Sequence, residues 1–266
     1  SGNARAVRML VEAVRAKLGL DEHTILLSHL PPLLERREEE IAQAQQELER
    51  MVGLEAPRRM IQTVMDNLEY DMEFNAAADG GVNTHPGNMV FVGPPGTGKS
   101  TMAQIMARYL YGLGVTERPD ALVVTAKDLI GEYVGQTAPK VGDVFARAQG
   151  GILFIDEAYA LADNQEFGRQ AVTALVGEIT LPANATVIVI LAGYPGDMDR
   201  LFRLNDGLER RFSHTIRFEN FAPPDCSELA RRAIAAKSYT AEDSFFPALE
   251  TFAAEAIRSQ RESFGN

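Results

Sequence analysis

Short apolar runs alternate along the middle of the chain with stretches whose apolar residues recur at helical spacing. Each run has the length and composition of a buried strand. Strands that alternate with helices indicate a mostly parallel sheet with helices on both faces, and therefore an α/β fold. The five expected strands are Asn88–Val92, Ala121–Thr125, Ile152–Ile155, Thr186–Leu191 and His214–Phe218.

Helical patterns flank this region on both sides. The chain before it carries apolar positions at helical spacing up to Gly19 and then a charged, solvated helix, whereas the chain after Pro223-Pro224 is helical throughout. The expected organisation is a helix over residues 1–19, a helical connector over 20–50, a large α/β nucleotide-binding subdomain over 51–222 and a small all-helical subdomain over 223–266.

One apolar run leads directly into a glycine-rich turn and a new helix. In this strand–turn–helix context, the glycines let successive backbone N–H groups point at phosphate oxygens, and the positive end of the helix adds to the attraction. We expect Lys99 to reach the β- and γ-phosphates and the Ser100 hydroxyl to bind Mg²⁺. The residues expected to bind nucleotide are Pro94, Pro95, Gly96, Thr97, Gly98, Lys99, Ser100 and Thr101.

Two carboxylates follow the expected strand Ile152–Ile155. A carboxylate at the end of a buried strand costs free energy unless an opposite charge balances it, and Mg²⁺ supplies such a charge. We expect Asp156 to hold the metal, usually through water. Glu157 is expected to orient and polarise the attacking water.

Two arginines follow the expected strand Thr186–Leu191. Phosphoryl transfer needs positive charge against the leaving and transferred groups, so Arg210 or Arg211 is a candidate for a finger that reaches a neighbouring subunit's site. Ordinary surface ion pairs are an equal alternative for paired arginines. Every motif is expected at the carboxyl ends of the strands, where ligands bind in such sheets.

The segment Asp128–Gln136 places Tyr133 and Val134 between glycines. By residue type alone, a buried tyrosine is the simpler expectation. A loop with an aromatic tip that grips an extended polypeptide is the alternative.

The composition of the chain limits which classes of partner and which cellular compartment are expected. The net charge of −11 disfavours nucleic acid as a partner, because phosphate backbones attract basic surfaces. One cysteine, Cys226, forms no internal disulfide and fits a reducing compartment. No apolar run approaches the roughly 20 residues that span a bilayer. The first residues contain no signal-peptide core, so a cytoplasmic protein without a membrane partner is expected.

Together these motifs resemble those of AAA+ ATPases. The pattern is most similar to the CbbX/SpoVK group, which includes red-type rubisco activases, and to the ATPase half of the EccA secretion proteins. The resemblance covers about residues 51–222 well. The stretches that carry it are Gly93–Ser100, Leu129–Lys140, Gly150–Tyr159 and Val189–Arg200.

The resemblance implies a P-loop NTPase fold with a five-stranded parallel sheet and a helical lid. It also implies a homo-oligomeric ring, commonly a hexamer, that binds ATP or ADP with Mg²⁺ at subunit interfaces and pulls on a protein client through pore loops. By position, Tyr133 and Val134 match the pore-loop pair. Arg211 matches the trans-acting arginine, with Arg210 as the alternate. Val52 and Gly53 match the segment that lines the adenine.

The fourth expected strand departs from the family pattern. Many AAA+ proteins carry a polar sensor residue at its end, whereas this strand ends Leu191-Ala192-Gly193-Tyr194. The residue that senses the γ-phosphate is therefore not identified by the resemblance.

The two ends of the chain also depart from the family pattern. The family's lid finishes with a helix that opens Gly-Asn-x-Arg; this chain stops at Phe264-Gly265-Asn266, but begins Gly2-Asn3-Ala4-Arg5. We therefore expect a fragment of a tandem AAA+ protein, in which residues 1–19 finish the preceding lid. Docking of this segment on the lid of its own chain or of the next would bring Arg5 to the nucleotide. A free amphipathic helix is the alternative.

The leading hypothesis is an ATPase, an ATP-hydrolysing motor that remodels or threads a protein through a ring pore. The alternative is a nucleotide-dependent assembly scaffold with slow turnover, which the intact Asp156-Glu157 pair disfavours. A DNA-acting motor would need basic pore residues. A nucleotide kinase would share the P-loop, but carboxylates followed by two arginines point to hydrolysis. Rubisco, a secretion component and a sporulation protein fit equally well as the client.

Overall fold

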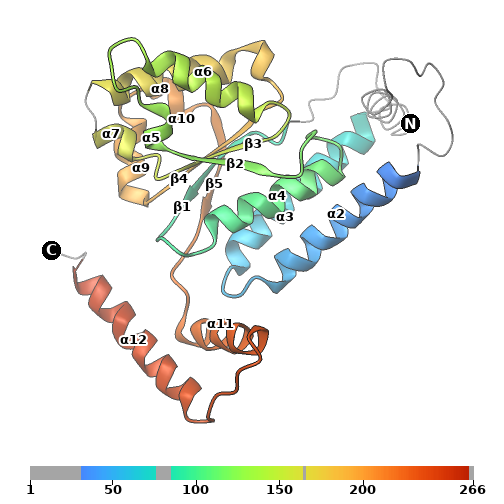
Figure 1. Cartoon of the computed structure of the whole chain (residues 1–266), viewed down its shortest axis with the longest axis vertical. Helices are drawn as coiled ribbons and strands as arrows, with labels where there is room; N and C mark the ends of the chain where they lie inside the picture. Colours follow the sequence, from blue (N-terminus) through green and yellow to red (C-terminus); the bar gives the residue numbers. More distant parts are fainter. Residues whose placement is uncertain (1–30, 76–84, 164–165, 264–266) are drawn as a thin grey trace.

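A computed structural model describes residues 31–75, 85–163 and 166–263 (Figure 1). The described residues form a five-stranded sheet with the order β2-β3-β4-β1-β5, in which every neighbouring pair is parallel. The α/β sheet expected from the sequence is thus confirmed. The strands are β1 (Asn88–Val92), β2 (Ala121–Thr125), β3 (Ile152–Asp156), β4 (Ile188–Gly193) and β5 (Phe212–Arg217).

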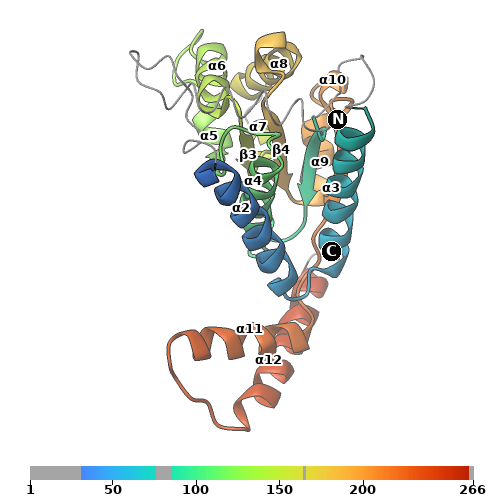
Figure 2. The ribbon, with the colours of Figure 1, turned by 90° about the vertical axis from the view of Figure 1, so that its right-hand side faces the viewer.

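Helices cover both faces of the sheet (Figures 1 and 2). One face carries α2 (Pro31–Arg50), α3 (Glu55–Asn75) and α4 (Lys99–Gly112). The opposite face of the sheet carries six further helices and a 3₁₀ turn, counted over the residues that the structure describes. They are α5 (Ala126–Leu129), α6 (Thr137–Ala148), α7 (Ala160–Asp163), α8 (Phe167–Thr180), the turn Pro182–Asn184, α9 (Pro195–Phe202) and α10 (Asp206–Glu209).

Two separate apolar cores hold the helices to the sheet, because successive side chains of a strand point to opposite faces. Phe91 and Phe154 face the core beneath α2, α3 and α4, where their rings meet edge to face. Val90 and Leu153, their neighbours in sequence, face the core beneath α6 and α8. Burial on both faces explains why the strands read as continuous apolar runs rather than as alternating ones.

Helix α4, which begins at the glycine-rich loop, is fixed to α2 and α3 by polar contacts as well as by the core. The Arg108 guanidinium pairs with the Glu47 carboxylate of α2. The Tyr109 hydroxyl donates a hydrogen bond of 2.7 Å to Glu69 of α3. Burial and this bond raise the pKa of Tyr109 to about 12. The helix that follows the loop is therefore held from two sides.

Gly112 sets the distance between α2 and α4. A Cβ atom at this position would lie 2.3 Å from Cγ1 of Ile41 and 2.9 Å from the backbone oxygen of Arg37. Both separations are far below van der Waals contact, so the two helices approach this closely only because residue 112 has no side chain.

A Gly112→Ala substitution is expected to lower the free energy of unfolding by about 1–3 kcal/mol, because overpacking outweighs alanine's better helix propensity. The matched control is Gly177→Ala in α8, where a Cβ meets nothing within 4 Å. This control is expected to stabilise by about 0.5–1 kcal/mol. Urea denaturation of both variants measures the two effects. Equal stabilisation by both substitutions would contradict the close contact between α2 and α4.

The last two helices, α11 (Pro223–Ala236) and α12 (Phe245–Ser263), pack on each other and stand apart from the sheet (Figure 2). The Arg231 guanidinium lies over the Phe246 ring, 3.7 Å from its centroid. Arg232 donates a hydrogen bond to the backbone oxygen of Arg50, where α2 ends. We refer to α11 and α12 as the lid. It is attached to the rest of the chain beside the α2–α3 junction.

The boundaries of strands β3, β4 and β5 differ from the sequence-based prediction. Strand β3 ends at Asp156 rather than at Ile155, and β5 ends at Arg217 rather than at Phe218. Strand β4 begins at Ile188 rather than at Thr186, because the Val187 N–H bonds to the Asn184 oxygen and closes the preceding turn. It continues to Gly193, which pairs with Val92 of β1. Strand β5 begins at Phe212 rather than at His214. Within the described residues, no helix is both long enough and apolar enough to cross a membrane.

Candidate active site

The loop between β1 and α4, called the P-loop below, has a conformation that glycine makes possible. Gly96 (φ 73°) and Gly98 (φ 88°) are in the left-handed region, which residues with a Cβ rarely adopt. The buried Thr97 hydroxyl donates to the Pro94 oxygen at 2.8 Å and closes the turn. The first N–H groups of α4 have no intrahelical acceptor, so the loop presents donors to an anion.

Lys99 extends back over the same loop. Its ammonium donates to the backbone oxygens of Gly93 at 2.8 Å and of Pro94 at 2.6 Å. Burial lowers the pKa of Lys99, and the nearby Asp156 carboxylate opposes that shift. Charge-assisted bonds to phosphate oxygens are stronger than bonds to neutral carbonyls. A bound phosphate would therefore compete well for this ammonium.

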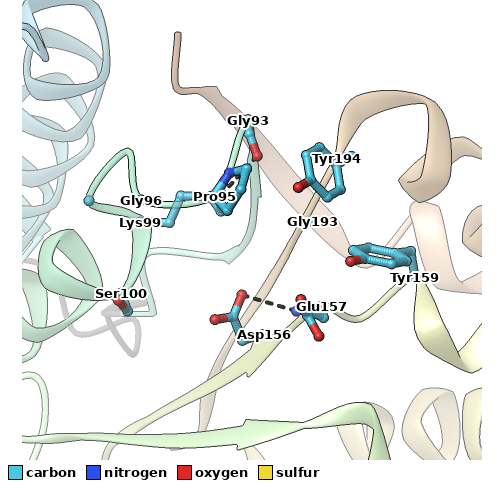
Figure 3. A pocket seen from close by; sticks show the side chains of 11 residues that line it. Gly93, Pro95, Gly96, Lys99, Ser100, Asp156, Glu157, Tyr159, Gly193 and Tyr194 are labelled. Atoms are coloured by element: carbon cyan, nitrogen blue, oxygen red, sulfur yellow. Dashed lines mark hydrogen bonds between the residues drawn. The ribbon is translucent and has the colours of Figure 1, made fainter. Parts of the chain in front are cut away.

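Two carboxylates follow the buried part of β3 and face the loop (Figure 3). Asp156 is half-buried and Glu157 is exposed. Glu157 has a φ of 49°, a conformation that costs roughly 1–3 kcal/mol for a residue with a side chain. Its N–H donates to Oδ1 of Asp156 at 3.0 Å. The chain thus turns sharply at the residue expected to act on water.

One pocket gathers these groups from the ends of β1, β3 and β4. Pro94, Thr97 and Thr101 belong to the same loop and helical turn but do not line it. The lining residues are Gly93, Pro95, Gly96, Gly98, Lys99, Ser100, Asp156, Glu157, Tyr159, Gly193 and Tyr194.

The oxygen ligands of this pocket fit Mg²⁺ bound together with a nucleotide. Mg²⁺ in phosphoryl-transfer sites takes one or two carboxylates, and substrate phosphates complete its shell. Ser100 and Asp156 supply a hydroxyl and a carboxylate from opposite sides of the pocket (Figure 3). In the part of the chain that the structure describes, no group of three or more His, Cys, Asp and Glu side chains could hold a metal by itself.

The two arginines lie at the amino-terminal ends of the strands, on the side of the sheet away from the pocket. The prediction that every motif follows the carboxyl end of a strand is therefore wrong for them. They precede β5, whose first residue Phe212 pairs with Asn88 at the start of β1. The Asn88 side chain donates to the Arg211 backbone oxygen at 3.1 Å. The P-loop follows the other end of β1, and a five-residue strand is roughly 16 Å long. Neither arginine lines the pocket of its own chain.

Arg210 and Arg211 also differ from each other. Arg210 is exposed, whereas Arg211 is half-buried and its Nη1 donates to the Gly207 oxygen at 2.6 Å. The Arg211 Nε is buried and has no hydrogen-bond partner among the described residues. The choice of arginine finger stays a prediction.

The α2–α3 junction, which contains Val52 and Gly53, lies beside the P-loop without lining the pocket. A Cβ at Gly98 would lie 3.2 Å from side-chain atoms of Met51 and Leu54, and a Cβ at Gly53 would lie 2.7 Å from Oδ2 of Asp225 in the lid. The junction therefore contacts both the loop and the lid. Its role at the adenine stays a prediction, and Arg5 lies outside the described residues.

The loop between α5 and α6 exposes its aromatic residue. Tyr133 is 68% exposed and Val134 is 79% exposed, so the expectation of a buried tyrosine is wrong. The base of the loop is fixed, because the Gly131 N–H donates to the buried Thr137 hydroxyl at 3.1 Å and Lys140 donates to the Ile130 oxygen at 2.9 Å. An apolar tip thus stands on an anchored base.

Two tyrosines that were not expected from the sequence also line the pocket. Tyr159 follows Glu157 closely in sequence, and Tyr194 directly follows β4. Both belong to stretches on which the family resemblance rests. Their position after strand ends was the available signal, because carboxyl ends of parallel strands converge on the ligand.

The fold and the pocket define a P-loop nucleotide-binding domain. The family model described as "ATPase family associated with various cellular activities (AAA)" matches residues 89–220. Protein CfxQ of Xanthobacter flavus is 34% identical over 223 residues, which are 82% of this chain and 68% of CfxQ. The chain belongs to the AAA ATPase family.

Within the family, the relatives match the group that the motifs indicated. The ESX-1 secretion system protein EccA1 of Mycobacterium tuberculosis is 36% identical over 240 residues, 85% of this chain. The chain spans only 40% of the length of EccA1. The plasmid-encoded protein CbxX of Cupriavidus necator is 35% identical over 206 residues, 76% of this chain and 63% of CbxX.

Solved structures support the fold. The FIGL-1 AAA domain in complex with ADP superposes with a TM-score of 0.54 at 20% identity, over 77% of this chain and 65% of that chain. A chain of the HORMA:CdnC:Trip13 complex of E. coli MS115-1 gives a TM-score of 0.53 at 19% identity, over 80% of this chain and 76% of that chain. These similarities extend to the overall architecture only.

Proposed function

We propose that this chain is an ATP-hydrolysing motor that remodels or threads a protein client through a homo-oligomeric ring, with a hexamer as the expected assembly. The observation that carries the proposal is the convergence of Lys99, Asp156 and Glu157 on one pocket, together with an exposed aromatic loop on the same domain. Phosphate binding, metal binding and water activation are thus combined with a surface suited to holding polypeptide.

The chemistry follows from the positions of these side chains. The loop N–H groups and Lys99 would bind the phosphates, and Ser100 and Asp156 would hold Mg²⁺, which would neutralise phosphate charge. Glu157 accepts a hydrogen bond from water and directs its oxygen at the γ-phosphorus. The new P–O bond forms as the bond to the bridging oxygen breaks, and Glu157 accepts the proton that the water loses, which gives ADP and inorganic phosphate.

The arrangement of the arginines supports an oligomeric site. A positive group is needed against the transferred phosphate, and Arg211 and Arg210 lie too far from the pocket of their own chain to supply it. A second copy of the chain that presents its own Arg211 or Arg210 to this pocket would complete the site. This is the structural argument for a ring in which each ATP lies between two subunits.

Two comparisons support a protein client, and two features of the sequence support a protein rather than nucleic acid as partner and a cytoplasmic location. A relative is named as a secretion system protein, and one structural neighbour was solved in a complex with other proteins. The net charge of −11 makes nucleic acid a poor partner, and the one cysteine suits a reducing compartment.

Replacement of Tyr133 by alanine is expected to uncouple the motor. Basal ATP turnover should stay within about twofold of wild type, because Tyr133 does not line the pocket, whereas stimulation of turnover by casein, an unfolded model client, should be lost. The matched control is Tyr239→Ala, since Tyr239 is 69% exposed and lies between the lid helices. Phosphate release with and without casein measures both. Casein stimulation that survives in Tyr133→Ala would contradict threading by this loop.

A further inference from the structure

The Asn88 side chain connects three neighbouring strands at their amino-terminal ends. Asn88 is the first residue of β1, which lies between β4 and β5 in the sheet. Its amide oxygen accepts the Val189 N–H of β4 at 2.8 Å, and its amide nitrogen donates to the Arg211 backbone oxygen at 3.1 Å. One side chain thus joins the strand that leads to the P-loop to the backbone of a candidate arginine finger.

Both bonds constrain the backbone because Asn88 is buried. Only 8% of the residue is exposed, and a buried amide group costs free energy unless it forms hydrogen bonds. Val189 is buried as well, so its N–H also depends on this contact. A displacement of the Arg211 backbone would therefore break a bond to a buried group.

The pairing of β1 with β5 is irregular at the same residue. Asn88 pairs with Phe212, whereas Met89 pairs with His214, so one extra residue of β5 lies between the two pairs. Such a bulge bends the strand and changes the direction of nearby side chains. The start of β5 is thus fixed against β1 in a special geometry, and Arg211 comes directly before it.

The Arg211 side chain is held from a second direction by α10. Its Nη1 donates to the Gly207 oxygen at 2.6 Å, and the Gly207 N–H donates to the capping side chain of Asn205 at 2.8 Å. A Cβ atom at Gly207 would lie 3.4 Å from the same Nη1. Helix α10 thus directs the guanidinium, while Asn88 fixes the backbone from which the guanidinium projects.

We propose that Asn88 is a positioning residue, which fixes the Arg211 backbone so that the Arg211 guanidinium reaches the nucleotide site of a neighbouring subunit. The inference rests on the proposed function, in which this arginine acts on the next subunit. Asn88 contacts no nucleotide, because it lies at the end of β1 away from the P-loop and does not line the pocket. An arginine aimed across an interface is sensitive to its anchor, since a misplacement of about 1 Å can cost roughly 100-fold in rate.

The first test measures kcat and nucleotide affinity in Asn88→Ala and Asn88→Leu. Both substitutions remove the donor to the Arg211 oxygen, and leucine keeps most of the side-chain volume. We expect kcat to fall about 10- to 100-fold in each, while the affinity for the nonhydrolysable analogue AMP-PNP stays within about twofold of wild type. Asn184→Ala is the matched control, because Asn184 is 7% exposed and donates to a backbone oxygen, that of Glu178, at 3.0 Å. Its kcat should stay at the wild-type level.

The second test is a mixing experiment that locates the defect. Glu157→Gln subunits have an intact arginine and an inactive pocket, whereas Arg211→Ala subunits have an intact pocket and no finger. An Asn88 variant with a misplaced finger should regain turnover when it is mixed with Glu157→Gln, and should regain none with Arg211→Ala. A variant whose own pocket is damaged would show the reverse pattern. Phosphate release from each mixture gives the result.

The outcomes separate this inference from the proposed function. A wild-type protein that does not hydrolyse ATP, or an inactive mixture of Glu157→Gln with Arg211→Ala, would overturn the shared site and the inference with it. If that mixture is active, an unchanged kcat in either Asn88 variant would overturn the inference alone. Loss of AMP-PNP affinity in both variants, an equal loss of kcat in Asn184→Ala or the reverse mixing pattern would do the same, because Asn88 would then only support the fold.

Discussion

ATP turnover falls by about 10²–10⁴-fold in a Glu157→Gln variant, whereas ATP affinity stays close to that of wild type; this is the first result that we expect from the active-site geometry. The amide has the shape of the carboxylate but accepts hydrogen bonds weakly and takes up no proton at neutral pH. Lys99, Ser100 and the loop are unaffected, because the backbone N–H of residue 157, rather than its side chain, donates to Asp156. Phosphate release and AMP-PNP binding are the two measurements.

Glu166→Gln is a suitable control for this experiment. It makes the same chemical change at an exposed residue that precedes α8 and does not line the pocket, so turnover should stay at the wild-type level. Unchanged hydrolysis in Glu157→Gln would assign water activation to another group. Loss of AMP-PNP affinity would instead indicate that Glu157 helps to hold the metal or the nucleotide.

Replacement of Arg211 by alanine is the second change with a large expected effect. If Arg211 acts on the site of the next subunit, kcat should fall about 10³-fold with ATP affinity nearly unchanged. Its bond to the Gly207 oxygen pre-orders the guanidinium, which favours it over the exposed Arg210. Arg210→Ala is the matched comparison and should cost much less. A larger loss in Arg210→Ala would reverse this assignment.

A mixing experiment separates action in trans from simple misfolding. Glu157→Gln subunits retain Arg211, and Arg211→Ala subunits retain Glu157, so a mixture of the two inactive proteins contains some interfaces with both intact groups. Activity should therefore reappear on mixing, and wild-type turnover per subunit should rise with protein concentration. A mixture that stays inactive while both variants keep their thermal stability would rule out a shared site.

The sheet and the phosphate loop were predictable because their signals are local. An apolar run of four residues, Met89–Val92, makes up most of β1, and the glycines and Lys99 that follow it form one continuous motif. The end of β4 was not predictable in the same way. Ala192 and Gly193 belong to the strand only because Phe91 and Val92 of β1 pair with them. Such pairing cannot be predicted from the neighbouring residues in the sequence.

The arginines and the tyrosines illustrate a second limit. Arg210 and Arg211 follow β4 in the sequence, but their location depends on β5. This strand starts directly after them, at the amino-terminal ends of the strands. Tyr133 was expected to be buried by residue type, whereas short flanking turns hold it outside. Tyr194 lines the pocket and packs against Tyr159, and this is a contact between residues far apart in sequence.

The short segment Met51–Leu54 has a mechanical consequence. It contacts the P-loop through Met51 and Leu54 at Gly98, and it contacts the lid through Gly53, which lies against Asp225 of α11. We expect this segment to act as a fulcrum, about which the lid tilts when the space beside Gly98 widens. Helix α12 has 19 residues and is therefore about 28 Å long, so a small displacement at the fulcrum becomes a swing of several ångströms at its far tip.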